Sequence, residues 1–591
     1  MQRQHDITGP RRIQNSSCDQ CRKARVACDA VRLGVRGKAI CTRCRKRKHE
    51  CTFEFVRTNK DVKPANNESK RRRRNAGGKT SVDVARPIHD LKDTLIQDAT
   101  DSEEAWLSSI YESGFEMVFG SWIGSYSNPF VFRDTAACGH SVSISQLCRE
   151  LDAWTATDPS PSYTGQVDES LRLAIQAFAA RWLPISSLNT SQPCFKQSKI
   201  SALWRQTRRE MLKAINRPTY RSMLTLILFG LTPIPDDVSE VEEVDGISGQ
   251  VCIQAALQQI VHLRARQRSL QFNGSKVSSD TTTSFNSPGQ AVDPSQYINA
   301  ENIVLWAALT FDTSASLTIG SRPLLSSGLF GFESEASWKL VQSCMNLFRS
   351  TFQDWETSEL DVTEDMANQI IAAAAAWKLY VWKMVAVFKE ALCDGHGEME
   401  VNRAFTAVVA AIDQFNSTYR GLLTVCQSRI HFLSQETKLR WYVATLHYHL
   451  SILMLVDVIE ATDRLDLLSR LTAARSEAES WALNCLVFGL ENTFTLAVPR
   501  KAGEESAIKS RGSVTVPLVS IDPYPHHVLA AVKLLRKAIE DGVVTGKITR
   551  NVHATLLATL ERALKQLPAS SKSVRAARDE MNVARNTEGK A

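Results

Sequence analysis

The first 51 residues contain Cys18-Asp-Gln-Cys21-Arg-Lys-Ala-Arg-Val-Ala-Cys28 and, after twelve intervening residues, Cys41-Thr-Arg-Cys44-Arg-Lys-Arg-Lys-His-Glu-Cys51. The unit C-x2-C-x6-C therefore occurs twice, and both copies are rich in Lys and Arg. Cysteine thiolates at such short, repeated spacings are typical ligands of structural zinc. The pattern predicts a small metal-organised domain over residues 18–51.

The number of cysteines restricts how the metal is held. Zinc prefers four ligands, so two separate sites would need eight thiolates, whereas this segment has six. Two zinc ions can each reach four ligands if two of the sulfurs bridge them. We therefore expect two Zn²⁺ per chain, and we expect metal binding to supply the folding energy of this short segment. The predicted ligands are Cys18, Cys21, Cys28, Cys41, Cys44 and Cys51.

A disulfide scaffold is the alternative explanation for clustered cysteines, and it requires an oxidising compartment. The residues after Met1 contain no apolar stretch of the kind that a secretory signal needs. The other eight cysteines are scattered along the chain, as reduced thiols usually are. Both observations favour a metal site.

Positive charge is concentrated at the same end of the chain. Residues 1–80 contain 23 Lys and Arg against 7 Asp and Glu, while the whole chain contains 71 against 63. Residues 81–591 are therefore acidic, with 48 basic and 56 acidic side chains. This asymmetry indicates a nucleic-acid partner for the N-terminal domain.

The cysteine spacing and its basic neighbours resemble the fungal binuclear zinc cluster (Zn2Cys6) family of transcription factors. The resemblance covers every ligand and both inner spacings. It implies that Cys18 and Cys41 bridge the two zinc ions, and that the domain binds double-stranded DNA. Parts of the remaining chain, among them Leu173–Trp182 and Phe311–Ser316, are similar to an activator of the same family.

The resemblance also implies roles for individual basic residues. In the family, the fourth residue after the second cysteine contacts guanine in the major groove of a CGG-like half-site, and here that residue is Arg25. An arginine can engage both guanine O6 and N7. Contacts to phosphates or neighbouring bases are assigned to the other basic side chains, including those of a basic arm over residues 1–17: Arg22, Lys23, Arg45, Lys46, Arg47, Lys48, Arg11 and Arg12.

Residues 52–99 are expected to form a basic linker. A dimerisation coiled coil would need several heptads, but Ile88, Leu91 and Leu95 supply only one. We therefore expect a monomer, or a dimer formed through the C-terminal region. A run of five basic side chains in the linker predicts nuclear import, with a phosphate-binding or merely solvated tail as the alternatives: Lys70, Arg71, Arg72, Arg73 and Arg74.

Helical periodicity dominates residues 100–565. Leu171, Ile175, Phe178 and Trp182, for example, recur on one face of a helix. Strand alternation is scarce. The sequence predicts a large all-α regulatory domain, which matches the helical region that follows the zinc cluster in the family.

Two segments interrupt or follow this predicted helical domain. A disordered insertion is expected near residues 269–295, and a polar tail over residues 566–591. The long apolar run Ile370–Phe388 contains Lys378 and Lys383, so we do not expect it to span a membrane.

No catalytic pattern is visible, and we do not expect an enzyme. His447 and His449 are two residues apart in a predicted helix and so point in different directions, which favours core or surface histidines over a joint metal site. One aromatic and acidic segment fits either an activation segment or a packed helix: Trp106, Phe115, Phe119 and Trp122.

These observations together predict a zinc-dependent, sequence-specific DNA-binding regulator in the nucleus. It is expected to activate transcription by RNA polymerase II for a metabolic or secondary-metabolite gene set, with double-stranded DNA and co-regulators as partners. The alternative is a zinc-stabilised scaffold for protein interactions that does not bind specific DNA.

Overall fold

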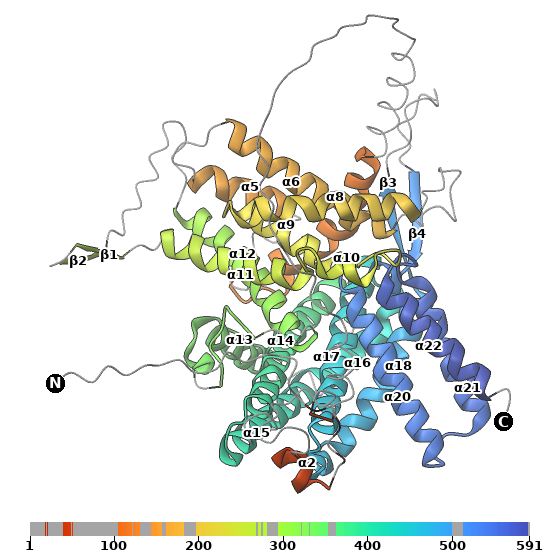
Figure 1. The fold of residues 1–591 in the computed structure, drawn as a ribbon. Coiled ribbons are helices and arrows are strands. Elements are labelled where there is room, and N and C mark those ends of the chain that lie inside the picture. Colours follow the sequence, from red (N-terminus) through yellow and green to blue (C-terminus); the bar gives the residue numbers. More distant parts are fainter. Residues whose placement is uncertain are drawn as a thin grey trace, which may run out of the picture.

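The computed structural model describes residues 18, 20–21, 40–48, 50, 52, 104–120, 122–130, 143–155, 161–182, 197–267, 270–273, 276–279, 294–318, 320, 322–329, 331–352, 362–498 and 512–588. Most of them are helical, which confirms the predicted helical body. The helices between residues 144 and 318 lie together in one part of this body, and those after residue 336 form the other (Figure 1). One hydrophobic core runs through both parts.

The first part of the body begins with two π-helical segments, the second of which ends at residue 126. Helix α9 lies in its centre, against α5, α6, α8 and α11. The elements are η2 (Tyr111–Gly120), η3 (Trp122–Tyr126), α5 (Ile144–Thr155), α6 (Pro161–Ala179), η4 (Ala180–Trp182), α8 (Gln197–Ile215), α9 (Tyr220–Leu231), α10 (Glu240–Val244), α11 (Gly249–Gln267) and α12 (Pro294–Thr318).

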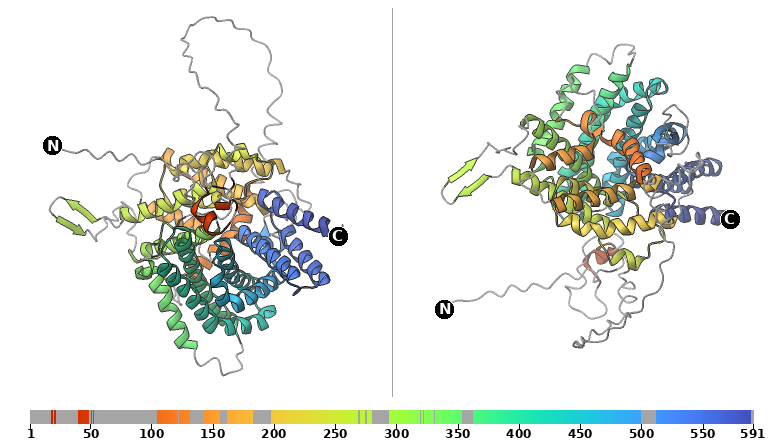
Figure 2. Two further views of the ribbon diagram at one scale, coloured as in Figure 1. Left: turned by 60° about the horizontal axis from the view of Figure 1, so that its bottom comes forward. Right: turned by 90° about the horizontal axis from the view of Figure 1, so that it is seen from above.

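The second part is built around α14 and α17, which pack against each other, and α18 and α20 lie against α17. Figure 2 shows α20 to α22, in blue, at one side of this helical assembly. The elements are η5 (Phe332–Ser334), α13 (Ala336–Phe352), α14 (Glu364–Cys393), α15 (Glu398–Phe415), η7 (Asn416–Arg420), α16 (Gly421–Arg429), η8 (Ile430–Phe432), α17 (Gln435–Ala461), η9 (Leu465–Leu471), α18 (Thr472–Glu491), α19 (Leu518–Ile521), α20 (Pro525–Val544), α21 (Arg550–Gln566) and α22 (Lys572–Glu588).

The N-termini of α14 and α17 are tied together, so the two helices begin side by side. Thr363 caps α14 and Ser434 caps α17, each accepting a hydrogen bond from a backbone N–H three residues on. The carboxylate of Glu364 accepts from the Ser434 hydroxyl at 2.6 Å. Further along, the indole N–H of Trp382 donates to the His447 carbonyl oxygen at 2.8 Å. Capping and packing together therefore set the alignment of the central helix pair.

Helices α14 and α17 are also long and apolar enough to cross a membrane by composition. In the structure, 94% and 83% of their most apolar stretches are buried inside the body. Apolar all-round surface is what the interior of a large helical core requires. His447 and His449 are both buried on α17, as expected of core histidines.

The aromatic segment near residue 115 is packed rather than exposed. Phe115 and Phe119 are buried, and their rings stack with centroids 4.7 Å apart. Phe115 also meets the ring of Phe178 edge to face. Of the two alternatives, the structure supports the packed helix.

The part of the chain that the structure describes contains four strands, in two antiparallel pairs. The sequence predicts a disordered insertion near residues 269–295. Within it, β1 (Leu270–Asn273) and β2 (Lys276–Ser279) pair as antiparallel strands, so the prediction is wrong for these eight residues. Strands β3 (Thr493–Val498) and β4 (Gly512–Pro517) form the second hairpin. Residues 572–588, expected to be part of a polar tail, form helix α22, which packs against α20 and α21.

Candidate metal centre

Four of the six predicted ligands lie together in the structure. The sulfur atoms of Cys18, Cys21, Cys41 and Cys44 are all within 4.8 Å of one another, and the four side chains are buried. The Cys18 sulfur lies 3.8 Å from that of Cys41 and 3.7 Å from that of Cys44, and the Cys21 sulfur lies 3.6 Å from that of Cys41. A tetrahedron with metal–sulfur bonds of about 2.3 Å has edges of about 3.8 Å, so these separations suit tetrahedral thiolate ligation.

Each C-x2-C unit brings its own two sulfurs together through local backbone structure. Cys41 is the N-cap of α2 (Thr42–Lys46), and its sulfur accepts a hydrogen bond from the Cys44 N–H at 3.3 Å. The Cys18 sulfur accepts from the Cys21 N–H at 3.4 Å in the same way. A helical start after the first cysteine therefore places the second cysteine one turn on, on the same side.

The surroundings of Cys41 lower the pKa of its thiol. Burial alone would raise its pKa, but hydrogen bonds from the Cys44 N–H and from the thiols of Cys44, Cys21 and Cys18 outweigh burial and lower the pKa to about 7. Since the thiolate is the form that binds a metal, this environment favours metal binding at neutral pH.

Several predicted site residues lie outside the described residues. They comprise two ligands, the predicted base-contacting arginine and its neighbours, the basic arm and the nuclear-import run: Cys28, Cys51, Arg25, Arg22, Lys23, Arg11, Arg12 and Lys70 to Arg74. Their assignments remain predictions.

The basic residues of the second repeat are described. Arg45 and Lys46 lie in α2, Arg47 and Lys48 follow it, and all four are exposed. Lys48 has a positive φ of 54° and so lies in the turn that ends the helix. The structure therefore groups these four side chains around the end of one short helix, next to the cysteine cluster.

Two arginines beside the cluster contact the helical body. Arg43 lies 3.3 Å from the Asp463 carboxylate, and Arg47 pairs with the same carboxylate and donates to the Thr462 carbonyl oxygen at 3.4 Å. Asp463 directly follows the C-cap of α17 and has a φ of 58°. Figure 1 shows α2, in red, against this end of the body.

Asp463 is not among the site residues that the sequence predicted. It lies in a charged segment at the end of α17, where Asp457 pairs with Lys537 and Arg464 pairs with Glu398. Pairing within the body is therefore the rule for this segment, and Asp463 is set apart by its two partners from the N-terminal domain. No local pattern in the sequence distinguishes it, because the contact joins positions about 420 residues apart.

Comparison of the chain with family models, with curated proteins and with solved structures found no match.

Proposed function

We propose that this chain is a zinc-dependent, sequence-specific DNA-binding regulator of transcription that acts in the nucleus. The observation that carries the proposal is the repeated C-x2-C-x6-C unit in basic surroundings, together with the convergence of four of its sulfurs. Zinc would supply the folding energy of the N-terminal domain and hold its basic side chains in a fixed arrangement.

The four described sulfurs suit one tetrahedral ion, and the second zinc ion of the proposal rests on the count of six cysteines. Cys18 and Cys41 each lie within 3.8 Å of two other sulfurs, including each other. Cys21 approaches Cys41, and Cys44 approaches Cys18. In the proposal Cys18 and Cys41 bridge the two zinc ions, and Cys28 and Cys51 complete the ligand sets.

Charge supports DNA as the partner. The sixteen excess positive charges of residues 1–80 stand against an acidic remainder of the chain. Arg45, Lys46 and Lys48 are exposed beside the cysteine cluster, where they can reach phosphates. Base recognition is assigned to Arg25, and transcriptional activation of a metabolic or secondary-metabolite gene set remains part of the proposal.

A protein-interaction scaffold is the second candidate, and one observation favours it. Arg43 and Arg47 bind Asp463 of the helical body, so the basic face of the N-terminal domain can contact protein. In that case the domain would hold its metal and still show no preference among DNA sequences.

In vitro selection of double-stranded DNA tests the proposal. The zinc-loaded full chain and its residues 1–80 are each used to enrich a random library, with and without a chelator. We expect enrichment of a CGG-like half-site that is lost with the chelator. Enrichment of one half-site indicates a monomer, and paired half-sites at fixed spacing indicate a dimer. A chain that keeps two zinc ions but enriches no sequence would support the scaffold instead.

A further inference from the structure

A cavity lies in the helical core, far along the chain from the cysteine cluster. It is partly open and is lined by η2, η3, α12, α14, α17 and the segment that begins α20. The volume in which the centre of a water-sized molecule can lie is about 50 Å³. This is several times the volume that one water molecule needs by the same measure. Its walls are mainly aromatic and aliphatic: Phe119, Trp122, Trp306, Leu379, Trp382 and Val443.

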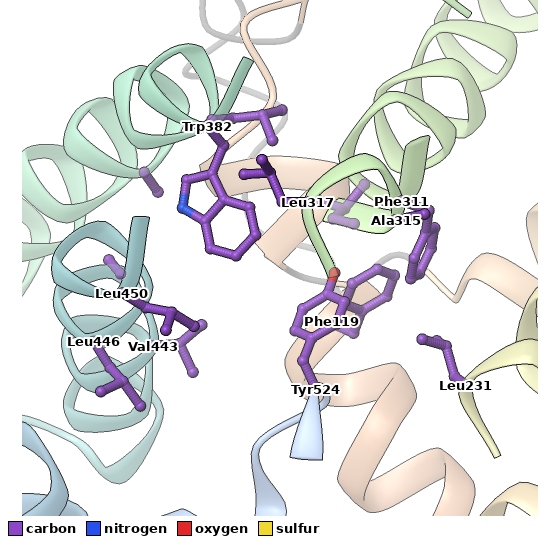
Figure 3. Packing of buried hydrophobic residues seen from close by; sticks show 14 of the residues in the cluster. Phe119, Leu231, Phe311, Ala315, Leu317, Trp382, Val443, Leu446, Leu450 and Tyr524 are labelled. Carbon is purple, nitrogen blue, oxygen red and sulfur yellow. The ribbon is translucent and has the colours of Figure 1, made fainter. Parts of the chain in front are cut away.

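The walls of this cavity come from distant parts of the chain. Figure 3 shows Trp382 of α14 facing Val443 of α17 on one side and the rings of Phe119 and Tyr524 on the other. All four side chains are buried. A small apolar molecule would therefore find contact surface on several sides, as small-molecule sites usually provide.

The side chain of Lys378, which lines the cavity, carries a positive charge in these apolar surroundings. Lys378 of α14 is 9% exposed, and among the described residues its ammonium group has no hydrogen bond or ion pair, although this nitrogen is not one of the side-chain atoms wholly shut off from solvent. Burial lowers the pKa of Lys378 to about 8, so the side chain is still mostly protonated at pH 7. An unpaired buried cation is unfavourable, and it is the feature that a bound anion would relieve.

The acidic side chain whose charge acts on Lys378 is Asp522, and one of its two carboxylate oxygens, Oδ2, has no hydrogen-bond partner among the described residues. Asp522 is buried; its carboxylate accepts a hydrogen bond from the Tyr524 N–H at 2.8 Å and lies 3.4 Å from Nε2 of His447. Its charge also acts on Arg181, a second buried cation, which lies 4.0 Å from the ring of Phe178. The terminal nitrogens of Arg181 have no acceptor among the described residues.

Two buried cations therefore share one carboxylate, and the region lacks one negative charge. The histidines add no further positive charge, because burial lowers the pKa of both His447 and His527 and so favours their neutral forms. His527 lines the cavity, and its Nε2 lies 2.8 Å from the Ser314 hydroxyl, while its Nδ1 has no partner among the described residues. Ser314 and His527 thus provide neutral polar groups beside Lys378.

We propose that this cavity binds a small organic monocarboxylate, with its carboxylate paired to Lys378 and its apolar part against Trp306, Trp382 and Tyr524. One surplus positive charge favours a ligand with one negative charge. The aromatic walls favour an organic ligand over an inorganic anion, because they offer apolar contact surface. The small volume selects a compact molecule. The proposal concerns the helical body and holds whether or not the N-terminal domain binds DNA.

Calorimetry and thermal unfolding of the zinc-loaded full chain test this site. The probes are 2-methylpropanoate and benzoate, each compared with its neutral amide and with inorganic phosphate at matched ionic strength. We expect at least one of the carboxylates to bind saturably with one molecule per chain and to raise the melting temperature, while the amides and phosphate do neither. Failure of both carboxylates to bind, equal binding of acid and amide, or equal binding of phosphate overturns the proposal.

Three variants identify the residue and the place. Lys378→Met removes the charge but keeps the apolar length, so we expect carboxylate binding to weaken at least tenfold without loss of stability in the ligand-free chain. Lys533→Met, which changes an exposed lysine of α20, is the matched control and should bind normally. Ala375→Leu fills the cavity while leaving Lys378 in place, and binding should again be lost. Undiminished binding in Lys378→Met overturns the assignment, whatever the folding of the Ala375 variant.

Discussion

The guanidinium of Arg43 lies 3.3 Å from the carboxylate of Asp463, a residue 420 positions further along the chain. Arg47 pairs with the same carboxylate. One acidic residue at the end of α17 therefore holds two arginines that flank the cysteine cluster. If the N-terminal domain binds DNA, phosphates and the helical body compete for these arginines.

Asp463→Asn should increase the affinity of the full chain for DNA. The side chains of Arg43 and Asp463 are 24% and 41% exposed, so solvent screens the pair and its loss is worth up to about 1 kcal/mol, or roughly fivefold in affinity. Fluorescence anisotropy with a CGG-containing duplex at low salt measures the change. Asp466→Asn removes a neighbouring charge that pairs with Arg464 and serves as the control. Equal affinity of both variants and the parent chain would show that the contact does not restrain the domain.

Cys21→Ala should reduce the metal content of the chain. With five thiolates left, two zinc ions can no longer each have four sulfur ligands, so we expect fewer than two zinc ions per chain and an unfolded N-terminal domain. Native mass spectrometry counts the bound ions. Cys393→Ala changes an exposed thiol of the helical body and should leave two zinc ions bound. The metal assignment is wrong if Cys21→Ala binds as much zinc as the control.

Arg25→Ala and Lys46→Ala should affect DNA binding differently. Loss of a bidentate guanine contact costs about 1–3 kcal/mol on the preferred site and little on random DNA. Loss of a phosphate contact at Lys46 should weaken binding to the preferred site and to random DNA by a similar factor. It should also reduce the number of counterions released on binding, which the salt dependence of the affinity reports, by about one. Titrations of both variants against specific and random duplexes separate the two roles. A uniform loss for Arg25→Ala would reassign that residue to a phosphate.

The helical body should lose stability on acidification, and His449 contributes to the loss. Burial, together with the charge of Arg420, lowers the pKa of His449 to about 3, whereas a histidine in the unfolded chain titrates near 6.5. Between these values the unfolded state binds the extra proton, so stability falls as the pH falls. The slope is about 1.4 kcal/mol per pH unit for one such histidine.

His449→Phe should remove this contribution and keep the stacking of the ring on Trp481. Urea unfolding at several pH values between about 4 and 7 measures the slope in the parent chain and in the variant. His431→Phe changes an exposed histidine and should leave the slope unchanged. An unchanged slope in His449→Phe would mean that His449 is protonated within the folded body.

Replacement of Lys70–Arg74 by a neutral segment of the same length should reduce nuclear accumulation, because import receptors bind clustered positive charge. Microscopy of the fluorescently tagged full chain measures the nuclear fraction. Replacement of the exposed pair Arg45 and Lys46 tests whether the cysteine-rich segment provides a second signal. If the variant without Lys70–Arg74 still accumulates normally in the nucleus, the import signal lies outside the linker.

Local spacing made part of the candidate site predictable. In a C-x2-C unit the two sulfurs approach because the chain begins a helical turn after the first cysteine, as at Cys41 and Cys44. Helical periodicity likewise identified the body, since apolar faces such as that of Phe178 must be buried. Both inferences depend on residues only a few positions apart.

The second hairpin shows where such local inference failed. Phe494 and Leu496 are buried while Thr495 between them is exposed, so β3 has the alternation of a strand. This pattern is only six residues long, and its partner β4 begins at residue 512, with thirteen residues between it and the end of β3. Pairing across that interval, more than the pattern in either strand, is what makes these residues strands.

The amino-acid sequence by itself determined the repeated cysteine spacing, the separation of basic and acidic charge along the chain and the helical nature of the body, because each depends on neighbouring residues or on composition. Only the tertiary structure decided that Asp463 meets Arg43 and Arg47, and that Lys378 lies unpaired in an aromatic cavity. Contacts of this kind depend on how helices far apart in the chain pack together. Whether a charge is paired, exposed or left alone in the core follows from that packing, which no local pattern encodes.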